Sequence, residues 1–188
     1  MSQLKMHFSA AKIAANPAPV VPAGFALRTY IPVQDDENYI ALMRNAGFKY
    51  WDGEFLKRTV TNMYPDGLFF LVDNGTGRLA ATAVANRTCV PGFPDGCEFG
   101  WLAADPAFQG RGLSRVVHDA VIQRFRQADV QNVYLSTDDH RIPAIKLYLG
   151  KGWEPVIVDD DARMRWEAIR NMLAKPAKQV SQEYGDRC

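Results

Sequence analysis

Cysteine and histidine are scarce in this sequence of 188 residues, which contains three of each. The cysteines, Cys89, Cys97 and Cys188, are odd in number and lack the spacing of metal ligands, so neither a disulfide framework nor a metal site is expected. We expect Cys89 and Cys97 to be free thiols. A nucleophilic cysteine is an alternative with little support, because neither has a histidine near it in the sequence.

Long apolar runs and an excess of charge of one sign are also absent. No run of about 18 apolar residues occurs, as a membrane span would need, and the N-terminus lacks the continuous apolar segment of a signal peptide. The formal net charge is only +1, which argues against the basic surface of a nucleic-acid-binding protein. We therefore predict a cytoplasmic protein with neither a membrane nor a nucleic acid as its partner.

The apolar content of 47% is enough for one sizeable core, and one domain is the default at this length. We predict a domain over residues 25–173, preceded by an N-terminal arm or linker (1–24) whose second half is rich in Pro and Ala, and followed by a polar tail (174–188). Alternating or continuous apolar stretches predict strands at 25–30, 68–72, 79–86, 97–103, 132–136, 156–158 and 164–166. Apolar spacings of three and four predict four helices. The first is capped by Asp35 and Asp36 and ends near Gly47, and the others lie at 53–62, after Leu113 and at 143–152.

The stretch Trp101–Ser114 (WLAADPAFQGRGLS) carries the strongest functional signal. It places an apolar strand before a glycine-bearing turn, and the turn opens an amphipathic helix. The backbone N–H groups of residues 110–114 can converge on an anion at this helix N-terminus, and Arg111 adds a full positive charge. The sequence therefore predicts a phosphate-binding turn. A Walker loop would need a Lys followed by Ser or Thr, and a dinucleotide fingerprint would need three spaced glycines, so neither fits.

The residues Gln109–Ser114 resemble the acyl-CoA signature of the GNAT superfamily of N-acetyltransferases, Gln/Arg-x-x-Gly-x-Gly/Ala, with Ser114 in the last position. Downstream, Ala144–Trp153 resembles the family segment A-x-x-L-Y-x-x-x-G-F, with Trp153 in place of Phe. Arg141 stands where many members carry Asn, which is a departure from the family pattern. The resemblance covers roughly residues 25–166.

This resemblance implies a mixed α/β fold with a central, mostly antiparallel sheet of six to seven strands, splayed at one parallel pair, and with helices on both faces. It further implies that acetyl-CoA binds in the splay. The implied acetyl-CoA-binding residues are Leu102, Ala103, Ala104, Gln109, Gly110, Arg111, Gly112, Leu113, Ser114, Arg141 and Tyr148.

The resemblance also suggests two catalytic residues. Several family members place a catalytic glutamate where Glu98 stands, and an amine with a pKa of about 10.4 needs a base to become a nucleophile. Side chains alternate along a strand, so Glu98 lies on one face and Phe99 and Trp101 lie on the other. If Phe99 and Trp101 are in the core, Glu98 faces the cleft. The alternative role of Glu98 is to pair with an arginine on a neighbouring strand. Tyr148 stands where the family has the acid that protonates the leaving thiolate, and its alternative role is a core aromatic.

The acceptor pocket is predicted around Tyr50, Trp51, Asp52 and Tyr64, where aromatic rings could hold a cation, although such residues are more often packing. Asp139, in a polar turn, is expected to cap the following helix. We predict an enzyme that transfers an acetyl group from acetyl-CoA to the primary amine of a small molecule by direct attack in a ternary complex. A protein N-terminus or lysine as acceptor, and a CoA-binding module without catalysis, are the alternatives. A homodimer is one option for its assembly.

Overall fold

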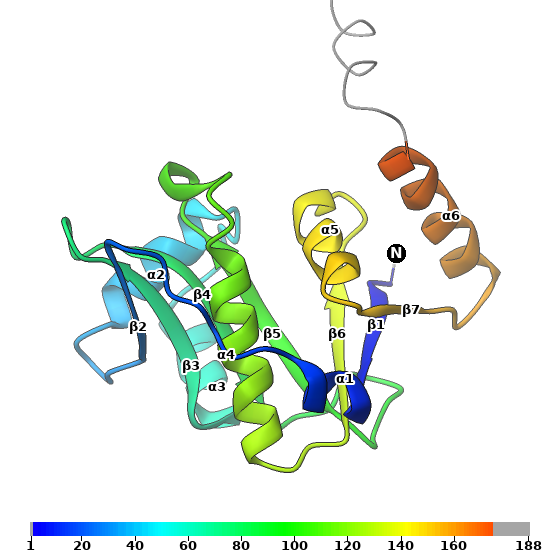
Figure 1. Cartoon of the computed structure of the whole chain (residues 1–188), viewed down its shortest axis with the longest axis horizontal. Coiled ribbons are helices and arrows are strands. Elements are labelled where there is room, and N and C mark those ends of the chain that lie inside the picture. Colours follow the sequence, from blue (N-terminus) through cyan, green and yellow to red (C-terminus); the bar gives the residue numbers. More distant parts are fainter. Residues whose placement is uncertain (1, 175–188) are drawn as a thin grey trace, which may run out of the picture. The chain divides into compact units, whose positions relative to one another are not determined.

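The computed structural model describes residues 2–174 and divides the chain into two compact units. The larger unit is His7–Leu135, and the smaller unit combines Met1–Met6 with Ser136–Cys188. The strands are β1 (Leu4–Ser9), β2 (Phe25–Thr29), β3 (Met63–Asp73), β4 (Leu79–Asn86), β5 (Cys97–Ala104), β6 (Asn132–Thr137) and β7 (Glu154–Val156). Their order in the sheet is β2-β3-β4-β5-β6-β1-β7 (Figure 1). The predicted mixed α/β class, with a sheet of six to seven strands, is confirmed.

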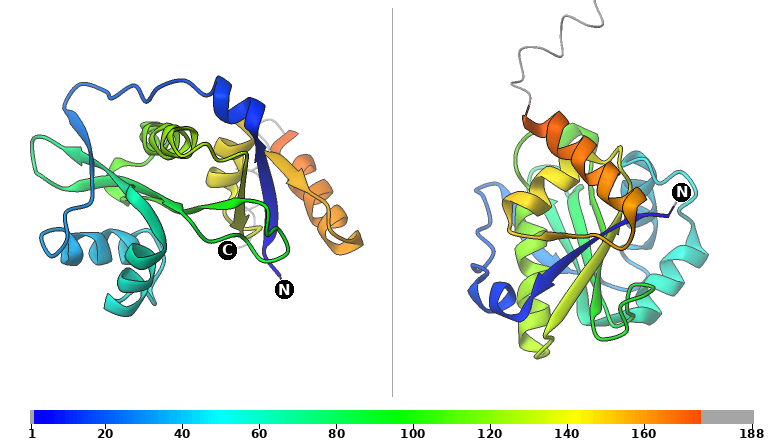
Figure 2. Two further views of the ribbon diagram at one scale, coloured as in Figure 1. Left: turned by 90° about the horizontal axis from the view of Figure 1, so that it is seen from below. Right: turned by 90° about the vertical axis from the view of Figure 1, so that its right-hand side faces the viewer.

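Antiparallel pairing dominates the larger unit. Strands β2 and β3, β3 and β4, and β4 and β5 pair in antiparallel fashion, while β5 and β6 form a parallel pair. Helices α2 (Asp36–Asn45) and α3 (Gly53–Asn62) lie on one face of this part of the sheet, and α4 (Ser114–Gln127) lies on the other (Figure 2, left). The prediction of helices on both faces is therefore confirmed.

The core between the sheet and helices α2 and α3 is rich in aromatic rings. Trp51 and Tyr39 are fully buried there, with their ring centroids 5.5 Å apart. Burying such large side chains accounts for much of the apolar area that this face removes from water. The buried members of this cluster are Tyr39, Leu42, Met43, Phe48, Trp51, Leu56, Leu68, Phe70, Leu79, Val84 and Ala103.

Asp35 differs from its predicted role as a helix cap. Its side chain caps no N–H group of α2. Instead it accepts hydrogen bonds from Arg28 Nη1 and Nη2, at 2.6 and 2.7 Å, and from the N–H of Ile31 at 2.7 Å. Burial alone would raise the pKa of Asp35, but these donors outweigh it and hold the pKa below its usual value. A buried carboxylate binds a guanidinium in preference to one helix N–H group, because the charge then has a partner of opposite sign.

The N-terminal segment differs from the predicted arm. Residues 4–9 form strand β1, in which Leu4, Met6 and Phe8 are buried and alternate with less buried residues, and α1 (Ala10–Ala15) follows. Within residues 2–24, only residues 2–3 and 16–24 lie outside a helix or strand. The arm prediction is therefore wrong for residues 4–15, because an alternating apolar pattern supports a strand even next to a Pro-rich segment.

The smaller unit contains helices α5 (Ile142–Gly150) and α6 (Asp160–Ala174). Pro143 lies in the first turn of α5, and Gly152 follows its end with a φ of +91°, both as predicted. The strand predicted at 164–166 is wrong, since these residues belong to α6, and β7 ends at Val156 rather than beginning there. The buried residues of α6, Ala162, Trp166 and Ile169, are spaced by four and three positions, as on one face of a helix. From residue 175 onward the predicted tail lies outside the described residues.

Candidate functional site

Strand β5 contains a β-bulge at Trp101 and Leu102. Only one residue of β4, Ala83, lies between the partners of Gly100 and Ala103, so two residues of β5 oppose one of β4. Trp101 has a φ of +50°, a left-handed conformation that is strained for a bulky side chain. The bulge removes Trp101 and Leu102 from the regular ladder with β4, as bulges near functional sites commonly do.

On its other side, β5 pairs with β6 only at its beginning. The parallel register holds at Cys97 with Val133 and at Glu98 with Tyr134, and the pairing then stops. Beyond Glu98, the register between β5 and β6 does not continue, so the edge of β5 from Gly100 onward has no strand partner on that side. Backbone N–H and C=O groups along this edge can therefore bind an extended ligand. The predicted acetyl-CoA-binding residues Leu102–Ala104 lie on this stretch.

The predicted phosphate turn lies between a short 3-10 helix, Pro106–Phe108, and α4. Gly110 and Gly112 have φ values of +77° and +72°, and a Cβ added at either would meet no atom within 4 Å. No side chain caps α4. Among residues 2–174, the backbone N–H groups of residues 110–114 donate no hydrogen bond to a backbone carbonyl of a turn, loop or cap. Backbone donors at a helix N-terminus therefore line an open turn that glycine keeps uncovered.

Arg111 supplies the cationic side chain of this turn. Its guanidinium carbon lies 4.8 Å from the ring centroid of Phe25 and 5.7 Å from that of Phe108, so it rests over two aromatic faces. Leu113 is buried and anchors the turn, while Gln109 and Arg111 are exposed. This combination of backbone N–H groups and one guanidinium fits the diphosphate of a CoA ligand.

Glu98 lies opposite Asn86 of β4, and Asn86 Nδ2 donates to Glu98 Oε2 at 2.9 Å. Asn86 is only 3% exposed, and its Oδ1 has no hydrogen-bond partner among the described residues. The partner that β4 offers Glu98 is therefore a neutral amide, which orients the carboxylate without neutralising its charge. The prediction missed Asn86, although it is the polar residue that ends the mostly apolar strand LAATAVAN.

The bulge also corrects the predicted faces of β5. The Phe99 ring lies 5.4 Å from the ring of His118 on α4, whereas the Trp101 ring lies 4.4 Å from that of Trp51 on the opposite face of the sheet. Phe99 and Trp101 therefore do not share a face, contrary to the simple alternation. Glu98 precedes the bulge and lies on the side away from Phe99, which is the side of Trp51 and Trp101.

The predicted acceptor residues are divided between roles. Trp51 is fully buried in the core, so its ring is closed to a substrate in this structure. The Asp52 side chain caps α3 and accepts hydrogen bonds from the N–H groups of Glu54 and Phe55, each at 3.0 Å. Tyr50 is 58% exposed, with its ring centroid 5.1 Å from that of Phe55. Tyr50 and Asp52 are thus exposed, whereas Trp51 between them is buried.

Tyr64 lies apart from the other three. Its ring packs against Phe125 of α4, with the guanidinium carbon of Arg124 5.2 Å from its centroid. It is therefore on the α4 side of the sheet, whereas Trp51 lies on the α2 and α3 side. Its hydroxyl lies 3.2 Å from Cys97 Sγ, and burial together with this contact raises the pKa of Tyr64 to about 12. The structure does not bring Tyr64 together with Tyr50.

Tyr148 and Arg141 belong to the smaller unit. Tyr148 is buried in α5, its ring 5.8 Å from that of Trp153, and this burial raises the pKa of its hydroxyl. The group is therefore protonated at neutral pH, as a proton donor must be. Arg141 Nε lies 3.3 Å from Asp138 Oδ2 at the beginning of α5. Asp139 does not cap this helix, contrary to prediction, because its carboxylate binds Arg165.

Other site classes find little support among residues 2–174. Cys89 and Cys97 are free thiols, as predicted, and Cys188 lies outside the described residues. No group of three or more His, Cys, Asp or Glu side chains in the described part of the chain is arranged to hold a metal ion. None of the described helices is long and apolar enough to cross a membrane.

Comparison with known proteins agrees with the geometry. The sequence model of a family described as the acetyltransferase (GNAT) family matches residues 33–152. Mycothiol acetyltransferase of Saccharomonospora viridis is 34% identical over 157 residues, which cover 76% of this chain and 50% of that protein. Mycothiol acetyltransferase of Thermobispora bispora is 30% identical over 151 residues, covering 76% and 51%. The chain thus spans about half the length of these relatives.

Solved structures show the same fold. A GCN5-related N-acetyltransferase from Sphaerobacter thermophilus superposes with a TM-score of 0.67 at 20% identity, covering 83% of this chain and 50% of that one. A tandem GNAT protein from the clavulanic acid biosynthesis pathway gives a TM-score of 0.62 at 19% identity, covering 82% and 50%. At these identities the likeness is one of architecture.

Proposed function

Because this chain belongs to the GNAT acetyltransferase family, we propose that it transfers an acetyl group from acetyl-CoA to the primary amine of a small molecule. The observation that carries this proposal is the combination found on β5. The strand bulges at Trp101, its register with β6 ends at Glu98, and it leads into the open turn before α4. An extended thiol arm and a diphosphate, the two ends of a CoA ligand, need such neighbouring sites.

In this proposal the turn and the strand edge bind different parts of the cofactor. Backbone N–H groups of residues 110–114 and the Arg111 guanidinium bind the diphosphate, while main-chain groups of Leu102 and Ala104 pair with the pantetheine arm. Acetyl-CoA supplies the activated thioester. The N–H group of Leu102, which lies in the bulge, donates to the oxygen that becomes negative when the amine attacks the thioester carbonyl.

Two side chains accept and donate the protons of the reaction. Glu98 accepts the proton that an ammonium must lose before it can attack, directly or through water, and Asn86 orients its carboxylate. Tyr148 donates a proton to the leaving thiolate, which is the conjugate base of a thiol with a pKa of about 8.5. Attack takes place directly on acetyl-CoA in a ternary complex, so no acetylated side chain is formed.

A small-molecule acceptor is favoured by the curated relatives, which are named as mycothiol acetyltransferases. Tyr50 is the exposed aromatic residue of the predicted acceptor segment and contacts the acceptor. A protein N-terminus or a lysine side chain is the alternative acceptor, and a panel of amines separates the two classes.

The testing experiment is calorimetric titration of the purified chain with acetyl-CoA and CoA, followed by thiol-release assays with small amines and peptides. We expect binding of both cofactors, and thiol release with at least one small amine. Release only with peptides would change the acceptor class. Binding without release for any amine would indicate a module without catalysis, for which the replacements at Ser114 and Arg141 are the sequence arguments. Absence of binding would overturn the proposal.

A further inference from the structure

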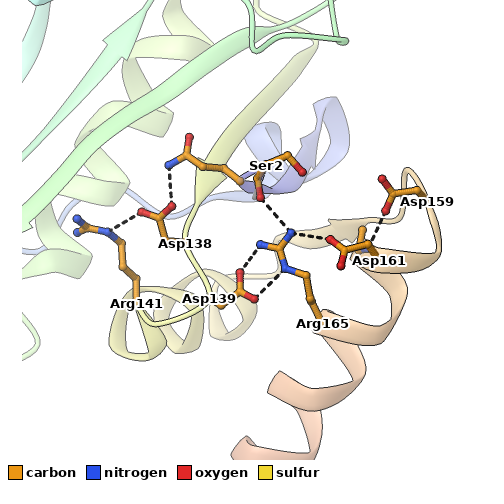
Figure 3. A network of polar contacts seen from close by, with 9 residues as sticks. Ser2, Asp138, Asp139, Arg141, Asp159, Asp161 and Arg165 are labelled. Carbon is orange, nitrogen blue, oxygen red and sulfur yellow. Dashed lines mark hydrogen bonds and ion pairs between the residues drawn. The ribbon is translucent and has the colours of Figure 1, made fainter.

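The loop that enters α5 is held by polar contacts on two sides (Figure 3). Asp138 accepts hydrogen bonds from Arg141 Nε at 3.3 Å and from Gln3 Nε2 at 3.2 Å. The backbone N–H of Arg141 also donates to the carbonyl of Asp138 at 3.0 Å. Residues 138–141 therefore have a defined conformation immediately before the helix that carries Tyr148.

Arg165 of α6 makes the most extensive contacts with this loop. Its Nε donates to Asp139 Oδ2 at 2.8 Å and its Nη2 to Asp139 Oδ1, a two-pronged arrangement. Its Nη1 donates to Asp161 Oδ2 and to the carbonyl oxygen of Ser2, each at 3.0 Å. Figure 3 shows the guanidinium between these three acceptors. The Arg165 side chain is only 13% exposed, so its guanidinium is committed to these contacts rather than to solvent.

The pKa shifts of Asp139 and Arg165 agree with these contacts. The hydrogen bonds from Arg165 hold the pKa of Asp139 below its usual value, and Asp139 in turn raises the pKa of Arg165. Both groups are therefore charged throughout the neutral range. A planar guanidinium that binds both oxygens of one carboxylate fixes its orientation as well as its distance.

The residues that hold the loop lie outside the region that the family model matches. That region ends at residue 152, whereas Arg165 and Asp161 follow it and Ser2 precedes it. The loop itself and Tyr148 lie within it. An ion pair with a partner that is 41% exposed, as Asp139 is, adds little to global stability. Its main effect is therefore local, on the conformation of the loop.

We propose that Arg165 is a positioning residue for acetyl-CoA use, acting through Asp139 on the 138–141 loop. This inference rests on the proposed function. The loop carries Arg141, a predicted cofactor contact, and Arg141 accepts the first α5 hydrogen bond through its carbonyl, from the N–H of Ile145 at 3.0 Å. Without the contacts of Arg165 the loop samples other conformations. The apparent affinity for acetyl-CoA then falls in proportion to the fraction of molecules whose loop has the conformation that binds the cofactor.

The experiment compares Arg165→Ala with Arg163→Ala in the full chain. Arg163 is the matched control because it is an arginine of the same helix, 61% exposed, with one ion contact of 3.7 Å to Asp160. For Arg165→Ala we expect a KM for acetyl-CoA raised about tenfold, with kcat and Tm close to those of Arg163→Ala. Hydrogen exchange of the backbone N–H groups of residues 138–147 should be faster in Arg165→Ala only.

A double-mutant cycle tests the route through Asp139. If Arg165 acts through this carboxylate, the combination of Asp139→Asn and Arg165→Ala should raise KM no further than Arg165→Ala alone. Equal KM values in Arg165→Ala and Arg163→Ala, additive effects in the cycle, or a loss of kcat that follows a lowered Tm would each overturn the inference. Failure of the wild-type chain to bind acetyl-CoA would instead refute the proposed function, before any variant is compared.

Discussion

Replacing Gly112 with Val tests the phosphate turn directly. Gly112 has a φ of +72°, and a Cβ built there meets no atom within 4 Å. The added Cβ therefore clashes with nothing in the protein itself. It would instead project into the open side of the turn, where the backbone N–H groups of residues 110–114 are proposed to bind the diphosphate of acetyl-CoA.

This substitution has two effects, one on the free energy of unfolding and one on the affinity for acetyl-CoA. A β-branched residue held in the left-handed region costs about 1–3 kcal/mol of folding stability, whatever its surroundings. Exclusion of the diphosphate from its backbone donors should weaken acetyl-CoA binding by about a hundredfold or more, which corresponds to about 2.7 kcal/mol. Gly77 provides the control, because its φ is +71° and its Cβ position is equally open, but it lies in the turn between β3 and β4.

The assay is calorimetric titration with acetyl-CoA, together with denaturant unfolding of each variant. We expect Gly77→Val and Gly112→Val to lose similar stability, while Gly112→Val alone loses affinity. Equal affinities in the two variants would refute the assignment of the turn, because the same backbone strain would then account for everything observed.

Three further outcomes follow from burial and charge. Tyr148→Phe should lower kcat by about a hundredfold or more with little change in acetyl-CoA affinity, and unchanged turnover in steady-state assays would remove Tyr148 from the mechanism. Trp51→Ala should lower the free energy of unfolding by about 3–5 kcal/mol in urea titrations, because the ring is fully buried, whereas Tyr50→Ala, at a site 58% exposed, should change it by about 0.5 kcal/mol or less. The pKa of Asp35 is lowered in the folded state, so its ionised form stabilises the fold above the unfolded pKa of about 3.9 and this contribution is lost as the pH falls through the folded value. The stability difference between the wild type and Asp35→Asn, measured from pH 7 down to pH 2, should therefore shrink on acidification, and a constant difference would contradict the ion pair with Arg28.

The turn before α4 and the bounds of α5 could be predicted because local chemistry determines them. Gly110 and Gly112 adopt positive φ values, Pro143 occupies the first turn of α5, and Gly152 follows its end. Each of these residues restricts or frees its own backbone, so the signal is contained in a few neighbouring positions. Such elements need no knowledge of the sheet around them.

Segments at both ends of the fold were harder to predict because their neighbours decide their structure. The alternation of Leu4, Met6 and Phe8 was readable but short, and it lies beside a Pro-rich stretch that is typical of a linker. Met164–Trp166 is apolar enough for a strand, yet Asp159 accepts a hydrogen bond from the N–H of Ala162 at 2.7 Å and so supports a helix start. In both segments the pattern permitted two structures, and packing selected one.

The bulge in β5 shows why the candidate base could be named from the sequence while its surroundings could not. Strict alternation places Phe99 and Trp101 together, but one extra residue in β5 relative to β4 turns Trp101 to the opposite face. No residue type in the stretch demands this, since Trp101 adopts its positive φ at a cost in strain rather than by preference. The consequence is that Glu98, Asn86 and the Trp101 ring lie on one face of the sheet, beside the strand edge where β6 ceases to pair. The same bulge places Trp101 and Leu102 opposite one residue of β4, and this irregular stretch is where the proposed mechanism needs a backbone N–H for the thioester oxygen.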